Sequence, residues 1–426
     1  MTVLSIYLDG TSCGTVEQSA SGNLTFTYEA EYRVGSDPTP LSLSMPLAAS
    51  AHKKRAILPY LQGLLPDSED ALRAIARRFA VSPNSPIALL QHVGTDVAGA
   101  VQIVESRSPA SDALDPRTTV RPVSEAEIGT MLAHVISEYS EGIPYYDAVG
   151  RFSLAGAQPK IALHRLPDGT WAVPEDATPT THILKPVAGP IRRIDVVEHM
   201  TMHAAGVLGN TVARSELVTI DGRDVFVTER YDRALVDGRW RRLHQEDLCQ
   251  ALSVPPTKKY QHRDGGPGLA DIARLIRSLP FESDRRAAGE RFYRAFVFNI
   301  VAGCTDAHAK NYSLMLDGST VQLAPLYDLV TYAPYWDGAS RLESAMSVDG
   351  EYSLDRIGSD MLVGAGKQFG VTSDAAEIVA ATRNGLVEAF ESARASLAES
   401  SAEVRAVADD VMRGLRQLPL VRTTPT

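Results

Sequence analysis

The sequence predicts an α+β protein made of three successive parts. Residues 1–105 mix strand and helix patterns, residues 121–240 are rich in short strand patterns, and residues 241–426 are mostly helical. Residues 106–120 are rich in Ser, Pro and Asp and lack apolar periodicity, which indicates a linker. A chain of 426 residues is long enough for two or three domains and for a large core without disulfides.

The N-terminal part carries both kinds of pattern. Residues 3–9 are expected to form a strand, and apolar and polar side chains alternate over residues 24–33, as in a half-buried strand. Apolar residues at spacings of three and four predict helices within residues 57–79, and residues 97–104 fit a closing strand. These features indicate a small α+β accessory domain.

The two later parts differ in character. Between residues 150 and 240 five strand patterns accompany one helix, at residues 195–208, whose apolar positions recur every four residues. The last part is dominated by helices, the first of them expected at residues 243–252. Two short strands are expected there as well, at residues 312–316 and 320–323. A strand-rich half followed by a helical half is the expected main body.

Charge and cysteine usage exclude several classes of protein. The formal net charge is −10, whereas a free-standing DNA-binding protein is usually basic, so we expect any nucleic-acid contact to come through a basic partner. The short basic run Arg239-Trp240-Arg241-Arg242 is interpreted as solvated surface. Three widely spaced cysteines predict neither a zinc site nor a disulfide framework. With no leader-like N-terminus and no stretch of 18 apolar residues, a cytoplasmic protein without membrane contact is expected.

The strongest chemical signal is the segment from Thr305 to Asn311. Phosphoryl transfer to a hydroxyl requires a carboxylate that accepts the proton and a nearby oxygen that holds Mg²⁺. Protein kinases place these groups as Asp-x-x-x-x-Asn on a loop between a helix and a strand, and Asp306 and Asn311 have that spacing and context. Asp328, after a further short strand, fits the second carboxylate of such a metal site.

Four weaker signals precede this segment in the chain. Lys185 lies before a proline, which favours a strand end, and Glu198 on the following helix is a possible ion-pair partner for it. The small-residue segment 153–160 could bring backbone N–H groups close to phosphate oxygens, and residues 227–232 could offer backbone groups to adenine. The order of these features along the chain is that of a kinase.

The same segments resemble the HipA-type toxin kinases of type II toxin–antitoxin systems. The resemblance rests on SLAGAQPK at 153–160, THILK at 181–185, ERYDR at 229–233, QEDLCQAL at 245–252, DAHAKNYS at 306–313 and LAPLYDL at 323–329. YLDG at 7–10, LQGLLPDSE at 61–69 and VGTDVAGAVQI at 93–103 resemble the N-terminal domain of that family. The resemblance implies a two-lobed protein-kinase-like fold with an N-terminal accessory domain. It also implies ATP and Mg²⁺ as cofactors.

The resemblance also implies roles for individual residues. Asp306 would be the catalytic base, Asn311 and Asp328 would hold Mg²⁺, and Ser153 would be an inhibitory autophosphorylation site. The residues expected to contact ATP are Ala155, Gly156, Ala157, Gln158, Pro159, Lys160, Lys185, Glu229, Arg230, Tyr231, His308, Ala309, Lys310, Asn311, Tyr327 and Asp328. The arginine that precedes the catalytic Asp in ordinary protein kinases is replaced by Thr305. The runs at 258–260 and 264–267 also look familial and receive no role.

The family further implies partners: a HipB-like helix-turn-helix antitoxin, operator DNA bound mainly through it, and a protein substrate such as an aminoacyl-tRNA synthetase, whose phosphorylation halts translation. Two other functions stay open. A small-molecule phosphotransferase would use the same Asp306, Asn311 and Asp328, although the accessory domain argues against it. The second alternative is a catalytically silent co-repressor. The presence of Lys185 and Asp306 argues against it, because an inactive relative is expected to have lost such residues.

Overall fold

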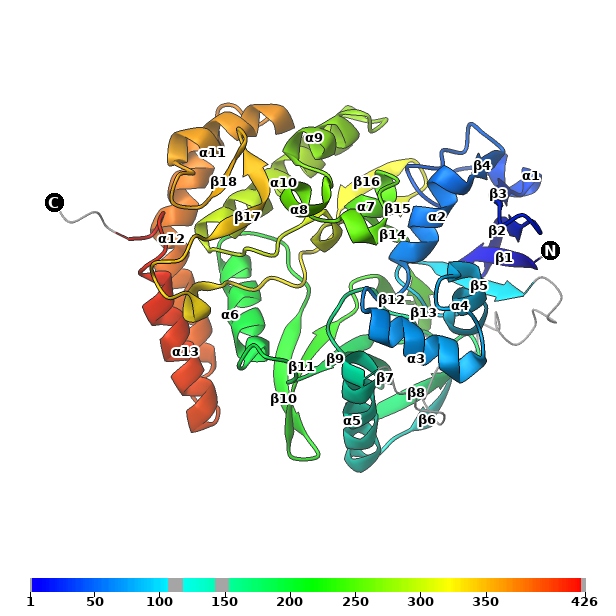
Figure 1. The fold of residues 1–426 in the computed structure, drawn as a ribbon, viewed down its shortest axis with the longest axis horizontal. Coiled ribbons are helices and arrows are strands. Elements are labelled where there is room, and N and C mark those ends of the chain that lie inside the picture. The colour runs from blue at the N-terminus through cyan, green and yellow to red at the C-terminus, as the bar shows by residue number, and fades with distance from the viewer. Residues whose placement is uncertain (1, 106–117, 142–152, 423–426) are drawn as a thin grey trace. The chain divides into compact units, whose positions relative to one another are not determined.

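The structure is a computed structural model that describes residues 2–105, 118–141 and 153–422. Its internal contacts divide the chain into two compact units (Figure 1). The first unit comprises residues 1–188, 218–257 and 315–319, and the second comprises residues 189–217, 258–314 and 320–426. Each unit is described by itself below. Residues 106–117 of the linker predicted at 106–120 lie outside the described residues.

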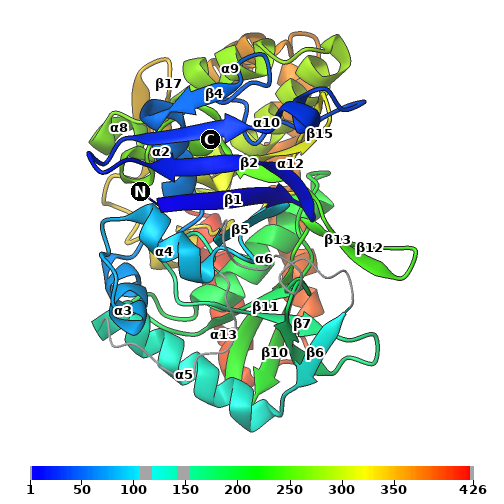
Figure 2. The same cartoon turned by 90° about the vertical axis from the view of Figure 1, so that its right-hand side faces the viewer.

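The N-terminal part of the first unit is built on a five-stranded antiparallel sheet (Figure 2). Its strands, in spatial order, are β4 (Ala51–Lys53), β3 (Leu24–Tyr28), β2 (Thr11–Gln18), β1 (Thr2–Leu8) and β5 (Val101–Glu105). The accompanying helices are α1 (Ala30–Arg33), α2 (Lys54–Gly63), α3 (Glu69–Phe79) and α4 (Pro86–Val93). Because the strands alternate inward and outward side chains, Leu4, Ile6 and Phe26 meet Tyr60 and Leu90 in one apolar core.

A second sheet follows in the same unit. Its order is β10 (Ser215–Ile220), β11 (Arg223–Glu229), β9 (His182–Pro186), β7 (Ile161–Arg165), β8 (Trp171–Glu175) and β6 (Thr119–Pro122). Helix α5 (Glu125–Glu141) buries Ile128 and Leu132 against Leu163, Leu184 and Val225 of this sheet. It starts at a capping box, in which Glu127 accepts hydrogen bonds from the Ser124 backbone and side chain. The hairpin β12 (Arg233–Val236) and β13 (Arg239–Arg242) comes next in the chain.

The second unit is mainly helical. Helix α12 (Ala375–Ser396) packs against α6 (Ile194–Val207), α10 (Glu282–Val301), α11 (Ser359–Gly366) and α13 (Ala402–Leu415), all seen in Figure 1. The smaller helices are α8 (Gln261–Asp264) and α9 (Leu269–Arg277), and β17 (Glu343–Val348) pairs with β18 (Glu351–Ser353). The expected short strands are present as β15 (Ser313–Asp317) and β16 (Thr320–Leu323).

Two sequence-based expectations about local structure are wrong. The strand expected over residues 24–33 ends at Tyr28, and Ala30–Arg33 turns into α1. The helix expected at 243–252 is divided into β14 (Gln245–Asp247) and α7 (Leu248–Ala251). Asp247 explains the division, because its carboxylate accepts the Gln250 N–H while the Gln250 side chain accepts the Asp247 N–H, a closed capping box that starts a new helix there. The domain boundaries inferred from sequence stay predictions.

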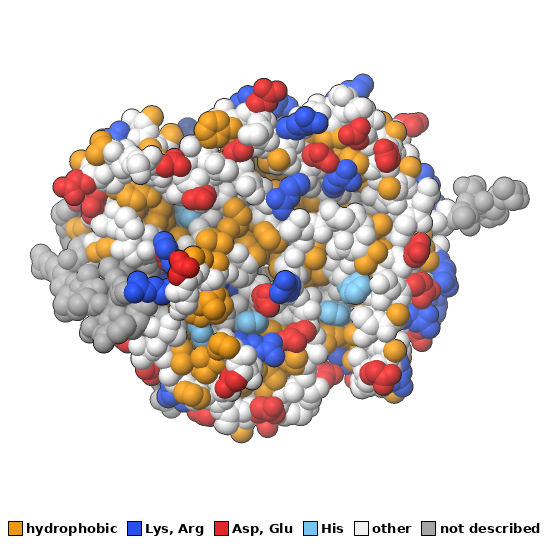
Figure 3. Space-filling model, turned by 180° about the vertical axis from the view of Figure 1, so that it is seen from behind, with side chains coloured by type: hydrophobic (Ala, Val, Ile, Leu, Met, Phe, Trp, Pro, Cys, Tyr) orange, Lys and Arg blue, Asp and Glu red, His pale blue; other side chains and the backbone are white. Residues whose placement is uncertain are grey.

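The surface and the cysteines agree with a globular chain of ordinary composition. Acidic and basic side chains are interspersed on the face shown in Figure 3. All three cysteines, Cys13, Cys249 and Cys304, are buried and none forms a disulfide, and burial raises the pKa of the Cys13 and Cys304 thiols. Among the described residues, no helix has both the length and the apolar character needed to cross a bilayer.

Five buried charges hold the first unit together. Asp96, in the loop after α4, accepts from the guanidinium groups of Arg233 at 2.8 Å, Arg242 at 3.3 Å and Arg230 at 3.4 Å, and from Thr180 Oγ1 at 2.6 Å. Asp232 completes this ion cluster by accepting from Arg230 at 2.8 Å and from the Gly99 N–H at 2.7 Å. Burial alone would raise the pKa of Asp96, but the three arginines outweigh it and lower the pKa. Asp96 is therefore ionised at neutral pH.

A further buried carboxyl group of the first unit, that of Glu246, lies outside this ion cluster. Glu246, 1% exposed, accepts hydrogen bonds from Ser42 Oγ at 2.5 Å and from the Leu43 N–H at 2.7 Å. Burial raises its pKa from 4.5 to about 8, with Asp247 adding to the effect. The folded protein therefore keeps a proton on Glu246 over a pH range in which the unfolded chain has lost it.

Replacing Asp96 by Asn should destabilise the protein strongly. The substitution keeps the side-chain shape but leaves three buried guanidinium groups facing one carboxylate, and breaking a buried pair typically costs about 3–5 kcal/mol. Urea unfolding at pH 7 measures the loss. Asp70→Asn, which breaks an exposed pair with Arg73 on α3, is the matched control and should change little. Equal stability of the two variants would contradict the importance of the cluster.

Replacing Glu246 by Gln should flatten the dependence of stability on pH. Glu246 contributes stability that is fully present below pH 4.5 and is lost as the pH rises through about 8, at up to about 1.4 kcal/mol per pH unit. The Glu246→Gln variant should lose this decline, as measured by urea unfolding between pH 5 and pH 8. Glu388→Gln, at an exposed position on α12, should keep it. If the stability of Glu246→Gln declines with pH as steeply as that of the wild type, the decline does not come from the raised pKa of Glu246.

Candidate active site

The segment after α10 forms a tight turn that brings Asp306 and Asn311 together. Gly303 adopts a left-handed φ of 68°, which ends the helix, and the Cys304 N–H donates to the Asn299 carbonyl at 2.8 Å. Within the turn, the His308 N–H and the Asn311 Nδ2 both donate to the Asp306 carbonyl, at 2.8 and 2.9 Å. The backbone of Asp306 is thus fixed by the residue five positions later, which explains the Asp-x-x-x-x-Asn spacing in physical terms.

Asp328 lies close enough to Asp306 to affect its charge. Burial of the Asp306 carboxyl raises its pKa, and the negative charge of Asp328 raises it further. Asp328 itself has a left-handed φ of 57°. Its segment is anchored at Leu326, which exchanges backbone hydrogen bonds with Thr211 at 2.8 Å and Ala213 at 2.9 Å. The two carboxylates therefore share one electrostatic environment in the second unit.

These residues fit a magnesium ion. The Nδ2 of Asn311 is engaged by the Asp306 carbonyl, so its Oδ1 is the atom left for a cation, and Asp328 supplies a carboxylate. Mg²⁺ takes oxygen ligands, often only one or two from protein, and keeps several waters. Among the described residues, no group of three or more His, Cys, Asp or Glu side chains is placed to hold a metal ion.

The other residues of this turn that are expected to contact ATP are buried. His308, Ala309, Lys310 and Asn311 are all buried, at 8% exposure or less. The hydroxyl of Tyr327 donates to the Lys310 carbonyl at 3.0 Å and bonds to Ser313 Oγ at 2.7 Å. Tyr327 therefore ties the segment that carries Asp328 to the segment that carries Asn311. This supporting role is visible only in the structure.

Lys185 and Glu198 occur on the elements expected for them. Lys185 lies in β9, where it pairs with Phe226 of β11, and its Nζ is 5.4 Å from the centroid of that ring. Glu198 lies on α6 and is 2% exposed. Lys185 belongs to the first unit and Glu198 to the second. Their ion pair stays a prediction.

The small-residue loop is bound to the N-terminal part of the first unit. Ser153 is 2% exposed; its Oγ donates to the Leu64 carbonyl at 2.8 Å and its N–H donates to the Asp96 carbonyl at 3.2 Å. The Gly156 carbonyl accepts the Asp67 N–H at 3.0 Å. The family-like run at 61–69 thus forms the surface on which this loop rests.

Lys160 closes the loop from its other end. Its Nζ donates to the Ala155 carbonyl at 2.8 Å and lies 2.4 Å from the position that a Cβ on Gly156 would occupy. Gly156 also has a left-handed φ of 112°. Only glycine meets both conditions without a shift of Lys160, which accounts for a glycine at this position.

Within the segment 229–231, the three side chains have different surroundings. The Arg230 guanidinium forms ion pairs with Asp96 and Asp232 in the buried cluster. Adenine could therefore contact only the backbone of Arg230. The Arg230 N–H already donates to the Thr181 carbonyl at 2.9 Å. Glu229 is exposed, and Tyr231 donates its hydroxyl to Gln245 Oε1 at 2.6 Å.

One contact of the second unit was missed by sequence reasoning. The hydroxyl of Tyr260 hydrogen-bonds to Asp306 Oδ1, across 46 residues of sequence. The ring of His308 meets the Tyr260 ring edge-on, with centroids 4.8 Å apart. In the sequence, the run Lys258-Lys259-Tyr260 resembles the HipA family, but this resemblance assigns it no role and does not indicate the contact with Asp306.

Comparison with known proteins gives the family. Residues 4–104 match the HipA N-terminal domain, and residues 152–411 match the HipA-like C-terminal domain. Y4mE of Sinorhizobium fredii, which is named as a kinase, is 35% identical over 87% of this chain and 86% of its own length. The serine/threonine-protein kinase toxin HipA of Shewanella oneidensis is 31% identical over 75% of this chain and 72% of its own length.

A solved structure shows the same fold. It contains HipA and HipB of Shewanella oneidensis with operator DNA, and it aligns with a TM-score of 0.80 at 24% identity, over 99% of this chain and all of that one. The expected kinase-like α+β fold is thereby confirmed. With both family domains matched in order and a kinase toxin of that family 31% identical, the chain belongs to the HipA family of toxin kinases.

Proposed function

We propose that this protein is an ATP- and magnesium-dependent serine/threonine kinase toxin that phosphorylates a protein serine. The observation that carries the proposal is the turn in which Asn311 Nδ2 binds the Asp306 carbonyl, beside the carboxylate of Asp328. Together the turn and Asp328 would provide a proton acceptor and two oxygen ligands for a hard cation, on two segments that the Tyr327 hydroxyl joins. Kinase chemistry needs little more than such positioning and charge.

In this mechanism Asp306 accepts the proton of the substrate hydroxyl. The hydroxyl oxygen attacks the γ-phosphorus of ATP, and the bond from that phosphorus to ADP breaks. Mg²⁺ held by Asn311 and Asp328 would neutralise charge on the phosphate oxygens. Lys185 would bind the α- and β-phosphates from the end of β9. The loop 155–160, the backbone of residues 229–231, residues 308–310 and Tyr327 would complete the contacts with ATP.

Ser153 is proposed as an inhibitory autophosphorylation site. Its hydroxyl is buried and donates a hydrogen bond to the Leu64 carbonyl, so the loop must leave this position before Ser153 can be modified. A phosphoserine carries about −1.5 to −2 charges at pH 7 and offers acceptors where Leu64 and Asp96 present carbonyl oxygens. The modified loop would therefore be unable to return, and ATP phosphates would be repelled.

The proposed partner is a HipB-like helix-turn-helix antitoxin that also binds operator DNA. The structural relative from Shewanella oneidensis was solved with HipB and operator DNA. A formal net charge of −10 suits an acidic kinase that reaches DNA mainly through a basic partner. An aminoacyl-tRNA synthetase in the cytoplasm is the proposed substrate, and its phosphorylation would halt translation, arrest growth and favour persistence.

A small-molecule phosphotransferase is the second candidate. The turn of Asp306 and Asn311 with Asp328 would serve it equally well, because the acceptor hydroxyl does not change the chemistry of the metal site. What favours a protein kinase is the contact of the Ser153 loop with residues 64–67 of the N-terminal accessory domain. A silent co-repressor is disfavoured by the intact ligands of the metal.

Incubation of phosphatase-treated protein with Mg-ATP should add one phosphate to the chain, as read by intact mass. Asp306→Asn should abolish the gain because the proton acceptor is lost, and Ser153→Ala should abolish it because the acceptor hydroxyl is lost. Ser124→Ala, at the capping box of α5, is a matched serine control that should keep the gain.

Other outcomes separate the alternatives. A wild type that binds Mg-ATP but gains no mass would favour a small-molecule phosphotransferase. A wild type that binds no nucleotide with or without Mg²⁺ would favour the co-repressor. Gain of a phosphate by Ser153→Ala would leave the kinase in place and contradict the assignment of the modified serine.

A further inference from the structure

The segment 258–268 has no part in the function described so far, yet one of its side chains touches the catalytic carboxylate. Tyr260 hydrogen-bonds through its hydroxyl to Asp306 Oδ1. We propose that Tyr260 is a positioning residue that clamps one oxygen of Asp306, so that the other oxygen faces the acceptor hydroxyl. The inference rests on the proposed kinase function, because it assigns Tyr260 a role through Asp306.

Tyr260 is itself held in place from several sides. The Arg263 guanidinium carbon lies 4.2 Å from the ring centroid, and the Lys259 Nζ lies 5.7 Å from it. His308, buried under the catalytic turn, meets the ring at an interplanar angle of 84°. A tyrosine contacted on several sides presents its hydroxyl in a fixed direction, as a positioning group must.

The glycine-rich end of the segment closes the loop around Tyr260. Gly265 has a left-handed φ of 67°, and the N–H groups of Asp264 and Gly266 donate to the Tyr260 carbonyl at 3.2 and 3.0 Å. A Cβ on Gly266 would lie 2.0 Å from the Lys258 carbonyl oxygen, a distance that no side chain allows. The two glycines are thus required for the turn that presents Tyr260.

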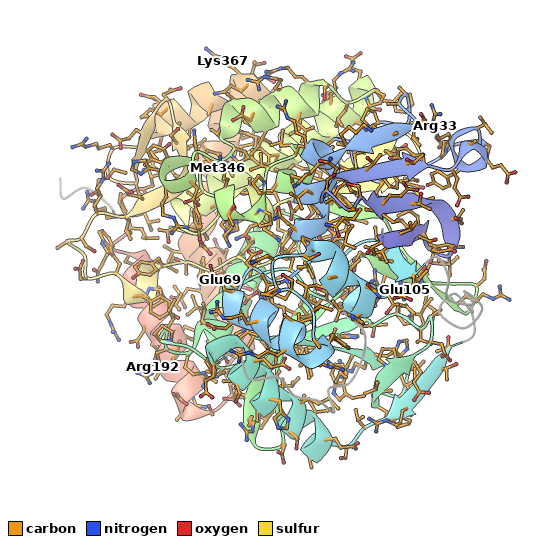
Figure 4. All side chains as sticks on the ribbon, turned by 45° about the vertical axis from the view of Figure 1, so that its right-hand side comes forward. Arg33, Glu69, Glu105, Arg192, Met346 and Lys367 are labelled. Carbon is orange, nitrogen blue, oxygen red and sulfur yellow. The ribbon has the colours of Figure 1, made fainter. Side chains whose placement is uncertain are left out.

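The loop is also anchored to a strand. Gln261 Oε1 accepts the Ser347 N–H at 2.8 Å, and Ser347 belongs to β17. Met346, its neighbour on β17, is buried and is labelled in Figure 4, and β17 packs against α8. Both ends of the short helix that follows Tyr260 are therefore fixed, by Gln261 at its start and by Gly265 after its end.

This arrangement replaces a feature that the chain lacks. Ordinary protein kinases carry an arginine before the catalytic Asp, where this sequence has Thr305. Here Lys259 and Arg263 bring positive charge to Asp306 from the loop, and Tyr260 adds a hydrogen bond. During transfer, the acceptor proton moves to the free Oδ2 while the acceptor oxygen bonds to phosphorus and the bond to ADP breaks.

The same contact has an opposite interpretation. The Tyr260 hydroxyl could occupy the place of the acceptor hydroxyl, and the loop would then have to leave before any substrate could bind. Removal of the hydroxyl separates the two interpretations, because it slows a reaction that needs the clamp and speeds a reaction that the loop blocks.

The test compares Tyr260→Phe with wild type and with Tyr352→Phe, all treated with phosphatase. Tyr352 stacks on His262 of the same loop, with centroids 4.5 Å apart, and is the matched control. The first-order rate of phosphate incorporation is measured by intact mass over a range of Mg-ATP concentrations. Tyr260→Phe should lower the rate at saturating Mg-ATP by about tenfold or more and leave the half-saturating concentration unchanged. Tyr352→Phe should match wild type in both.

The outcomes are distinguishable. An unchanged or increased saturating rate in Tyr260→Phe, with an active wild type, overturns the clamp and leaves the kinase standing. A higher half-saturating concentration or a lower thermal unfolding midpoint in Tyr260→Phe would mean that the hydroxyl only maintains the structure, which also overturns the proposal. A wild type that incorporates no phosphate overturns the proposed function, and the clamp with it.

Discussion

The buried ion cluster around Asp96 is the constraint on which the first unit depends. Asp96 enters from the accessory domain, whereas Arg230, Asp232 and Arg233 follow directly from β11. Neither group of charges could be buried without the other, because an uncompensated ion in an apolar interior is far more costly than a paired one. The accessory domain is consequently not a separate attachment. It supplies the counter-charge that lets the segment after β11 fold, and its Asp96 carbonyl also holds the loop of Ser153.

Much of the fold and of the candidate site was predictable because the signals are local. Helix α5 begins at a capping box, α6 has regular apolar spacing, and the Asp306–Asn311 spacing is set by one hydrogen bond within a single turn. What could not be predicted are contacts between distant segments. Arg242 belongs to a basic run interpreted as solvated surface, and it is instead buried against Asp96, while Arg239 and Arg241 beside it are exposed. Sequence alone does not distinguish a buried arginine from an exposed one, because the distinction depends on where the carboxylate lies.

The candidate site has the same division between local and distant contributions. The proposed metal ligands and the proposed base are carried by two short segments, and further side chains of the second unit contact these segments. Tyr327 joins the two segments through Lys310, and Tyr260 reaches Asp306 from a loop closed by Gly265 and Gly266. The glycines were visible in the sequence as a familial run, but their purpose depends on a carbonyl oxygen of Lys258 that only the folded chain brings near.

The burial of all three cysteines has a practical consequence. Thiols that are enclosed in the core react slowly with maleimides and with mild oxidants, and burial also raises the pKa of Cys13 and Cys304, which disfavours the reactive thiolate. The natural chain therefore provides a nearly silent background for site-specific chemistry. One cysteine placed on each unit, for instance at the exposed positions Glu388 and Arg239, would accept a pair of fluorescent dyes without removal of any native cysteine. Energy transfer between those dyes would then report whether nucleotide changes the distance between the two labelled positions.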